Sequence, residues 1–344
     1  MLINFDKAST VPATNAALEA FVRAPQGNPS SLHSEGVKAK KALETAREKI
    51  AACIGADPDE VYFTSGATEA CNWALNSMGS ADSVSGVIVS PYEHSAVLAA
   101  KKPSRCAGVH KAHILANNVT GTVYDIKTMR GKCKGLFFTD ATAAVGHIPV
   151  NFHDLGVDYM AFGGHKFGAP KGTGALIVKR GAPLSPLISG GGQEEGKRGG
   201  TESVPLICAM ANALSLACVS ISMEAPFVRT LCGVISQHVS EVCGGRDRAF
   251  VHVPRSAPFG TLPGTLNIIF PGIAAQSMVL RLSKFGVLTS AGAACSGDAL
   301  EPSASLILEG ETPEDAACAV RLSLDGNNTL EEVEFFLNIL PNVL

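Results

Sequence analysis

The sequence predicts an α/β fold, in which a mostly parallel sheet flanked by helices is joined to a smaller α+β domain. Short apolar segments alternate with helical stretches along the chain, which is the pattern of parallel strands connected by helices. Hydrophobic residues make up 46% and charged residues 17% of the chain, and this composition excludes intrinsic disorder. With 344 residues the chain is too long for one ordinary core, so two domains are expected.

The larger domain is expected over residues 14–225. Residues 35–54 have helical spacing, and Val37, Ala42, Ala46 and Ile50 share the face predicted to be buried. The weakly polar segment after Val204 predicts a long buried helix, to about residue 219, rather than a membrane span. Short apolar runs predict strands at residues 60–64, 84–90, 135–139, 157–162 and 174–178.

The pattern changes around residues 222–227, so we place a domain boundary near residue 225. The small domain is expected to comprise residues 1–13 and 226–344. Its predicted elements are a helix at 227–242, a strand at 265–270, a helix at 275–285, a loop of small residues at 290–297, and a final strand and helix.

Charge and cysteine spacing exclude several classes of protein. The formal net charge is -3 without a long basic run, which argues against a nucleic-acid binder. No secretory signal precedes the first apolar segment, so we expect a cytoplasmic protein without a membrane partner. No two of the ten cysteines form a CxxC pair, so we expect no metal site, and most cysteines should be reduced and buried.

A turn at residues 64–69 follows the first predicted strand and opens a helix. Its sequence, TSGATE, places a glycine and three hydroxyl side chains where backbone N–H groups and the positive end of the helix dipole are exposed. Such a turn can hold a phosphate, although no GK[ST] follows as in a Walker loop. The alternative interpretation is an ordinary capped helix.

Two further strands are followed by ionisable residues. Lys166 lies after the strand VDYMAF, where ligands of open sheets gather, and a lysine in such a place can become a nucleophilic amine. Asp140 ends the strand GLFFT and could ion-pair a pyridinium nitrogen. The alternatives are a solvated loop lysine and a helix-capping aspartate. A phosphate turn, an acid and a lysine together are what pyridoxal phosphate requires, and His94 could stack on its ring.

Cys295 differs from the other nine cysteines in its surroundings. It lies in SAGAACSG, a run of small residues, whereas the others lie in or beside strand-like or helix-like segments. A thiolate on such a flexible loop can enter a site, attack and withdraw. The alternative is a buried cysteine in a tight turn.

Eight motifs occur in one order along the chain: GNPSSLHSEG (27–36), FTSGATEACNWAL (63–75), EHSAV (93–97), TDATAAVG (139–146), VDYMAFGGHKFGAPKGTGAL (157–176), GGGQEEGKRGGTESVP (190–205), SAGAACSGDALEPS (290–303) and VRLSL (320–324). With them the chain resembles the cysteine desulfurases of the NifS/IscS type, which are fold-type I, class V pyridoxal-phosphate enzymes. The resemblance covers nearly the whole chain and implies a sheet of the seven-stranded type. The loop around Cys295 resembles the longer, flexible cysteine loop of this family.

The resemblance implies roles for individual residues. Lys166 matches the lysine that holds the cofactor covalently and then acts as a base, and Cys295 matches the nucleophile that receives sulfur as a persulfide. Asp140 matches the partner of the pyridine nitrogen. His94 matches the histidine that stacks on the ring and handles protons.

Other matching positions bind the cofactor or the substrate. The resemblance implies that Arg321 and Asn118 bind the carboxylate of L-cysteine, Asn118 lying also near the cofactor. Phosphate ligands are implied at Ala67, Thr68 and His165 and, from the other subunit of a homodimer with shared sites, at Thr201. The resemblance also implies a protein that accepts the sulfur, for iron–sulfur cluster assembly or another thio-compound, without identifying it.

The chain departs from the family pattern at several points. Ala143 stands where a glutamine is usual and Gly163 where a phosphate-binding serine or threonine is usual. His94 and Asn118 are only 24 positions apart, so a strand–helix portion of the large domain is expected to be missing. Little sequence follows the last helix, so we expect most of the scaffold-docking tail of relatives to be absent. Two alternatives stay open: a selenocysteine or other cysteine lyase, and a weakly active or non-catalytic homologue that binds a partner.

Overall fold

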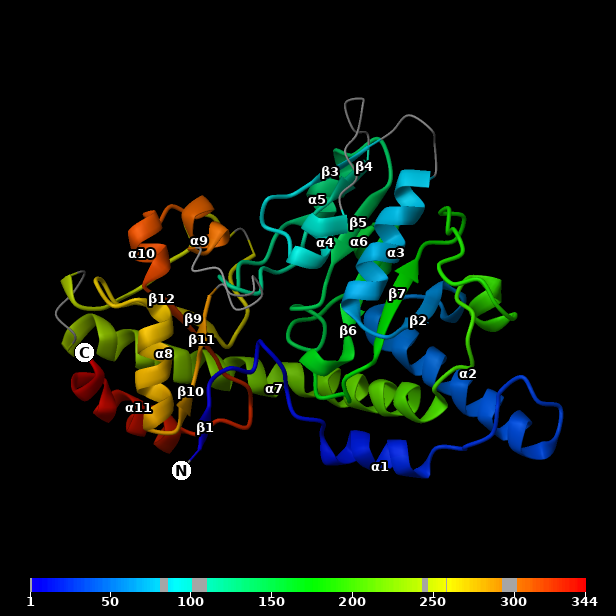
Figure 1. The fold of residues 1–344 in the computed structure, drawn as a ribbon, viewed down its shortest axis with the longest axis horizontal. Helices are drawn as coiled ribbons and strands as arrows, with labels where there is room; N and C mark the ends of the chain where they lie inside the picture. The colour runs from blue at the N-terminus through cyan, green and yellow to red at the C-terminus, as the bar shows by residue number, and fades with distance from the viewer. Residues whose placement is uncertain (1, 81–85, 101–109, 243–246, 258, 293–301) are drawn as a thin grey trace. The chain divides into compact units, whose positions relative to one another are not determined.

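Two units make up the chain in the computed structural model, which describes residues 2–80, 86–100, 110–242, 247–257, 259–292 and 302–344 (Figure 1). Unit 2 comprises residues 11–115 and 125–219, and unit 1 comprises residues 1–10, 116–124 and 220–344. The domain limits expected from the sequence, at residues 13 and 225, stay a prediction.

A six-stranded sheet forms the centre of unit 2, in the order β2-β7-β6-β5-β4-β3. Strands β3 to β6 are parallel to one another, whereas β7 is antiparallel to both of its neighbours. The α/β class with a mostly parallel sheet is confirmed, and the described residues supply six strands where a seven-stranded type was expected. The strands are β2 (Val61–Thr64), β3 (Val87–Val89), β4 (His110–Ala112), β5 (Phe137–Asp140), β6 (Tyr159–Gly163) and β7 (Gly174–Val178).

Helices bury the faces of this sheet. Every residue of β6 and β7 is buried, as expected for central strands covered on both sides. On one face, Trp73 and Ala74 of α3 pack against Phe138, Tyr159 and Leu176. The helical elements of unit 2 are α1 (Asn15–Arg23), α2 (Ser34–Ile54), η1 (Pro58–Glu60), α3 (Ala67–Ser80), α4 (Ser95–Ala100), α5 (Ile126–Gly131), α6 (Phe152–Leu155), η2 (Gly164–Lys166) and η3 (Gln193–Gly196).

Helix α2 shows where the predicted inner face was correct and where it was wrong. Ala46 and Ile50 are buried, but Val37 is 58% exposed and Ala42 is only half-buried. The buried residues in the first half of the helix are instead Gly36, Ala39 and Leu43, so the buried face there is rotated away from the predicted one.

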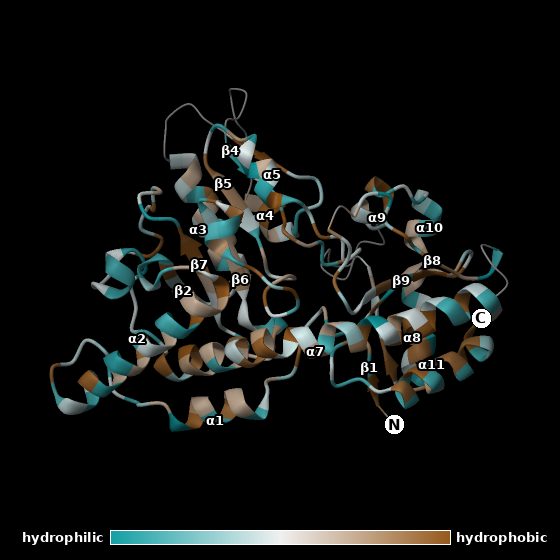
Figure 2. Ribbon diagram, turned by 180° about the vertical axis from the view of Figure 1, so that it is seen from behind, coloured by the Kyte–Doolittle hydropathy of each residue, from teal (hydrophilic) through white to brown (hydrophobic). Residues whose placement is uncertain are grey.

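Helix α7 (Val204–Val242) is one helix of 39 residues where two were expected. Pro226 lies inside it, within residues 222–227, where the sequence pattern changes. Leu214 before the proline and Leu231 and Ile235 after it are fully or almost fully buried, and this packing outweighs the cost of the proline. The N-terminal part of the helix is mostly apolar, whereas hydrophilic residues become frequent toward its C-terminal end (Figure 2). By length and composition alone the helix could cross a membrane, a test that core helices also pass.

Unit 1 contains a four-stranded antiparallel sheet in the order β11-β12-β9-β8 and a two-stranded parallel pair of β1 and β10. Its core gathers apolar residues of α7, α8, α11 and these strands, with Phe5 and Phe336 in edge-to-face contact. The elements are β1 (Ile3–Asn4), β8 (Phe250–Val251), β9 (Thr265–Ile269), α8 (Ala275–Lys284), β10 (Val287–Leu288), β11 (Ser290–Ala291), α9 (Ala304–Leu308), α10 (Pro313–Ala317), β12 (Ala319–Ser323) and α11 (Leu330–Val343).

A buried ion pair fixes the turn η3 against α2. Glu194 and Glu195 are non-glycine residues with left-handed backbones, at φ angles of 46° and 57°. The Glu194 carboxylate accepts from both terminal nitrogens of Arg47, at 3.1 and 2.9 Å, and from the backbone N–H of Phe63 at 2.9 Å. These bonds hold Glu194 in a conformation that usually favours glycine.

Candidate functional site

Three of the predicted site segments lie at one edge of the unit 2 sheet. Thr64, the last residue of β2, and Gly163, the last residue of β6, both pair with Gly174 of β7. Because β2 and β6 are therefore parallel, the turn after Thr64 and the turn that carries Lys166 leave the sheet at the same edge. Asp140 ends β5, the neighbour of β6, and pairs with Ala161.

Helix α3 begins at Ala67, within the predicted phosphate turn of residues 64–69. Thr68 is exposed at the second position of the helix, and Ala67 is half-buried. A Cβ placed on Gly163 would lie 3.3 Å from both the Cβ and the backbone nitrogen of Ala67. The absent side chain thus leaves the first N–H of α3 open to an anion, which helix N-termini favour.

Glu69 ties the same turn together. Its carboxylate accepts from the backbone N–H of Ser65 at 3.1 Å and from the Ser65 hydroxyl. Arg198 donates its Nε to Glu69 at 3.0 Å. These bonds lower the pKa of Glu69 even though burial, the largest influence, raises it. Glu69 is therefore ionised and holds the turn, and its positioning role was not predicted from the sequence.

Asp140 is a buried carboxylate, 3% exposed. Its Oδ1 accepts from the backbone N–H of Thr142 at 2.9 Å and from the Thr142 hydroxyl. Burial, and then the charge of Asp140, raise the pKa of Glu93 well above its usual range. Burial and the same two carboxyl groups raise the pKa of the Cys71 thiol. Glu93 and Cys71 are consequently neutral beside Asp140, and Cys71 has none of the thiolate character of a nucleophile.

Lys166 ends the short turn η2 and is half-buried. Its backbone oxygen lies 3.0 Å from Nε2 of His147. The neighbouring residue, His165, has a pKa lowered to about 4. The main cause is burial, and the charges of Lys166 and Lys171 add to it. His165 is therefore neutral at physiological pH and able to donate one hydrogen bond without adding charge.

His94 stands at the start of α4. Its Nδ1 accepts from the backbone N–H of Ala96 at 3.1 Å, so the neutral ring carries its proton on Nε2. The imidazole is half-buried. This arrangement fixes the tautomer and leaves Nε2 as the ring's donor.

Thr201 is exposed and lies in unit 2, at a cavity of about 110 Å³. Ser65, Gly174 and Arg198 also line this cavity, so Thr201 lies beside the turn that precedes α3.

Two predicted residues lie in unit 1, where they meet. Arg321 of β12 is 4% exposed and donates Nη1 to the backbone oxygen of Asn118 at 2.8 Å. Its Nη2 donates to Asp6 at 2.9 Å and to Ser9 at 2.9 Å. Its Nε has no hydrogen-bond partner among the described residues, although it is buried. A buried guanidinium with donor capacity left over fits the binding of a carboxylate.

Cys295 lies outside the described residues, but the strand before it is described. Ser290 of β11 pairs with Arg321, and Ala291 pairs with Val320. Gly292, the last described residue before Cys295, is therefore two positions beyond the strand partner of Arg321. The seven described cysteines are all free.

One further cluster has the composition of a metal site. The potential ligand atoms of Asp57, Glu60 and His153 lie within 4.8 Å of one another. His153 is already 2.8 Å from Glu60, and Arg180 is 3.0 Å from Asp57. The two carboxylates are thus already bonded to side chains of the protein, and the cluster is no part of the groups described above.

Comparison with known proteins agrees with these features. The aminotransferase class-V family matches residues 3–116 and 109–336. The chain is 35% identical to the cysteine desulfurase IscS of Dictyoglomus turgidum, over 99% of this chain and 94% of that protein. It is 32% identical to the cysteine desulfurase IscS of Methanosarcina thermophila, over 99% and 92%. Among solved structures, a NifS-like protein superposes with a TM-score of 0.89 at 30% identity, over 100% of this chain and 99% of the other.

Proposed function

Because the chain belongs to the class-V aminotransferase family, and within it to the cysteine desulfurases, we propose that it converts L-cysteine to L-alanine and transfers the sulfur to Cys295. The observation that carries the proposal is the edge of the unit 2 sheet. This edge offers the groups that pyridoxal phosphate needs: the start of α3, Asp140 at the end of β5, and Lys166 in its turn.

The residues present fit this cofactor. The open N–H of Ala67 beside Gly163 and the neutral His165 would hold the phosphate, and the buried Asp140 would hold the ring nitrogen. Lys166 would bind the cofactor covalently, and His94 would stack on its ring. When bound, pyridoxal phosphate acts as an electron sink at the carbon that carries the substrate's amino group.

The chain's own residues then account for the reaction. Arg321 binds the substrate carboxylate, and the Lys166 amine takes a proton from the substrate Cα. The Cys295 thiolate attacks the substrate sulfur, so that an S–S bond forms while the Cβ–S bond breaks. The electron pair of that bond stays on the organic fragment, which gains one proton at Cβ, equivalent to the one that the Cys295 thiol lost on ionising. The Lys166 ammonium returns the proton at Cα, and the fragment leaves as alanine. Cys295 keeps the sulfur as a persulfide, which passes to an acceptor thiol.

We propose further that two copies of the chain share their sites. The exposed Thr201, beside the turn before α3, is the residue we assign to the partner's phosphate. A homodimer of this kind would work in the cytoplasm with a sulfur-acceptor protein, in keeping with the iron–sulfur assembly role of the family. The comparisons with named desulfurases favour this activity over a selenocysteine lyase or a non-catalytic homologue.

The test is an absorption spectrum of the protein loaded with pyridoxal phosphate, before and after L-cysteine is added, with alanine and sulfide measured in the same sample. We expect a spectral change and release of alanine. Lys166→Ala should abolish both, whereas Lys171→Ala, an exposed lysine on the same segment, should keep both.

The second pair of variants separates the desulfurase from other lyases. Cys295→Ala should bind cysteine with the spectral change but form no persulfide and release no alanine, whereas Cys208→Ala should behave as the wild type. A loaded wild-type protein that releases no alanine from cysteine would contradict the proposal. Selenocysteine cleavage that survives Cys295→Ala, together with loss of cysteine turnover, would favour a selenocysteine lyase.

A further inference from the structure

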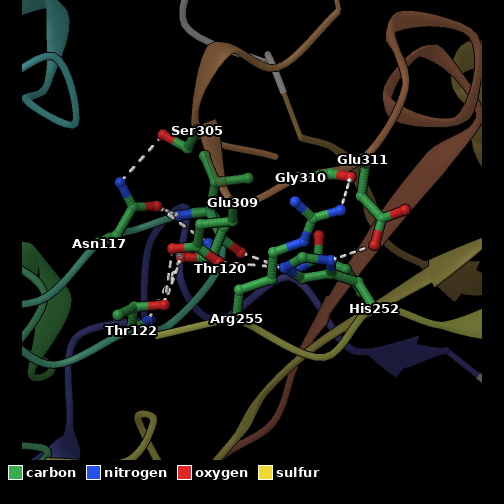
Figure 3. A network of polar contacts seen from close by, with 11 residues as sticks. Asn117, Thr120, Thr122, His252, Arg255, Ser305, Glu309, Gly310 and Glu311 are labelled. Carbon is green, nitrogen blue, oxygen red and sulfur yellow. Dashed lines mark hydrogen bonds and ion pairs between the residues drawn. The ribbon is translucent and has the colours of Figure 1, made fainter. Parts of the chain in front are cut away.

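A buried polar network in unit 1 joins the loop that carries Asn118 to helix α9 and to His252 (Figure 3). Glu309 is at its centre. One carboxylate oxygen accepts from the hydroxyls of Thr120 and Thr122, at 2.9 and 2.7 Å. The other lies 3.1 Å from Nε2 of His252, whose Nδ1 lies 2.6 Å from Glu311.

Because the network is buried, its two carboxylates would be destabilising without a positive charge beside them. The side chains of His252, Glu309 and Glu311 are exposed by only 1%, 4% and 8%. Two carboxylates so close together need a cation between them, and His252 is that group. The hydrogen bonds and charges of Glu309 and Glu311 raise the pKa of His252 although burial lowers it. The other cation nearby, Arg255, donates to the backbone oxygen of Gly310 at 2.9 Å.

The network is bonded to the loop around Asn118, whose backbone oxygen accepts a hydrogen bond from Arg321. The Asn117 side chain accepts from the backbone N–H groups of Val119 and Thr120, at 2.8 and 2.9 Å, which closes a tight turn around Asn118. Asn117 also donates to Ser305 of α9 at 3.0 Å. The turn that presents the Asn118 carbonyl to Arg321 is therefore bonded to α9.

Helix α9 begins at Ala304, nine residues after Cys295. The two segments that the network joins are thus the substrate-carboxylate turn and the helix that follows the cysteine segment.

We propose that His252, in its protonated form, is a positioning residue for the desulfurase reaction: through Glu309 it fixes the Asn118 turn and helix α9, and so sets the affinity of Arg321 for the substrate carboxylate. This inference rests on the proposed function, which supplies the substrate. With the proton removed, Glu309 and Glu311 repel each other, and the turn that supports Arg321 loosens.

The first test compares the wild-type holoenzyme with His252→Gln, measuring kcat and KM for L-cysteine from alanine release between about pH 6 and pH 9. We expect KM to rise about tenfold at pH 7, the equivalent of one charge-assisted hydrogen bond, with kcat changed less than about threefold. The ratio of the two KM values should fall toward one as pH rises through the pKa of His252, because the wild type then loses the same charge.

A matched control separates positioning from general loss of stability. Val333→Ala removes buried methyl groups from the core of the same unit, away from the network, and should lower Tm while leaving KM and its pH dependence unchanged. Thr122→Val removes one hydroxyl bond to Glu309 and should raise KM by a smaller factor than His252→Gln.

A second readout does not depend on activity. Amide hydrogen exchange at Val119 and Thr120 should become faster in His252→Gln but not in Val333→Ala. An active wild type whose KM is unchanged by His252→Gln, or whose KM ratio does not vary with pH, would overturn the inference. Unchanged exchange at these two amides would overturn it as well, whether or not the wild type is active. Lack of alanine release by the wild type would count against the proposed function instead.

Discussion

Ser290 and Arg321 are paired residues of the antiparallel strands β11 and β12. Gly292, the last described residue before Cys295, is two positions beyond Ser290. A change in the register of β11 against β12 would therefore move Gly292 relative to the arginine that we assign to the substrate carboxylate.

Arg321→Lys tests the guanidinium. The lysine keeps the positive charge but loses the fork that reaches the Asn118 carbonyl and Asp6 at once. We expect KM for L-cysteine to rise roughly 10- to 100-fold, with kcat affected less. Steady-state alanine release measures both. Arg281→Lys on α8 is the control, since Arg281 also bonds a backbone oxygen, and an equal effect there would refute the special role of Arg321.

Glu93→Gln tests the neutral carboxyl beside Asp140. An unfolded glutamate loses its proton above about pH 4.3, whereas the folded protein keeps it because the pKa of Glu93 is raised. The native state therefore binds one more proton than the unfolded state at neutral pH, and the free energy of unfolding falls as pH rises through this interval. Glutamine cannot ionise, so Glu93→Gln should be more stable than the wild type at pH 7.

Urea unfolding measures this difference. The gain from Glu93→Gln should be present at neutral pH and should vanish near about pH 4, where the wild type is protonated in both states. Glu48→Gln, on the exposed side of α2, should show no such pH-dependent gain. A loss of stability in Glu93→Gln at neutral pH would mean that Glu93 is ionised in the folded protein.

Gly163→Ser tests the departure from the family at the phosphate end. The new Cβ would lie 3.3 Å from Ala67, so the start of α3 must move by a few tenths of an ångström in any larger variant. Gly163→Ala carries the same Cβ without the hydroxyl and is the matched control. We expect Gly163→Ser to bind pyridoxal phosphate about three- to tenfold more tightly than Gly163→Ala, from one added hydrogen bond to a charged group. Equal dissociation constants, measured by absorbance titration, would show that no phosphate lies there.

Glu194→Gly tests the ion pair of Glu194 with Arg47. Glycine suits the left-handed backbone at φ 46°, and this relief contributes about 1 kcal/mol at most. The loss of both bonds to Arg47 leaves a guanidinium that is 12% exposed without its main partner, which costs about 3 kcal/mol or more. The free energy of unfolding in urea should therefore fall. Glu195→Gly, at φ 57° but exposed, should be close to neutral.

Short-range patterns predicted the elements well. The strand at residues 174–178 has the predicted bounds, and the strands predicted at 135–139 and 157–162 end one residue later, at Asp140 and Gly163. These strands follow from apolar runs that the core requires on both faces. The prediction of two helices, at 204–219 and 227–242, was wrong because the change in the local pattern was taken as the end of a helix. Buried leucines on both sides of Pro226 belong to one continuous helix.

The support of the site could not be predicted from sequence spacing. Arg321 is bonded to Asp6 across 315 positions, and Glu309 to Thr120 across 189 positions. Contacts at such separations leave no periodic signal, since they depend on which strands become neighbours. The carboxylate arginine could be assigned by resemblance, but the residues that orient it become visible only in the fold.

Gly174 has a consequence for how the chain can change. A Cβ there would lie 2.6 Å from the Cα of Gly66 and 2.8 Å from the backbone oxygen of Phe162. Strand β7, between β2 and β6, therefore has no room for a side chain at this position. Any side chain would wedge the turn before α3 away from the turn that carries Lys166. One added carbon atom at position 174 would therefore change the separation between the turn that we assign to the cofactor's phosphate and the turn that carries Lys166.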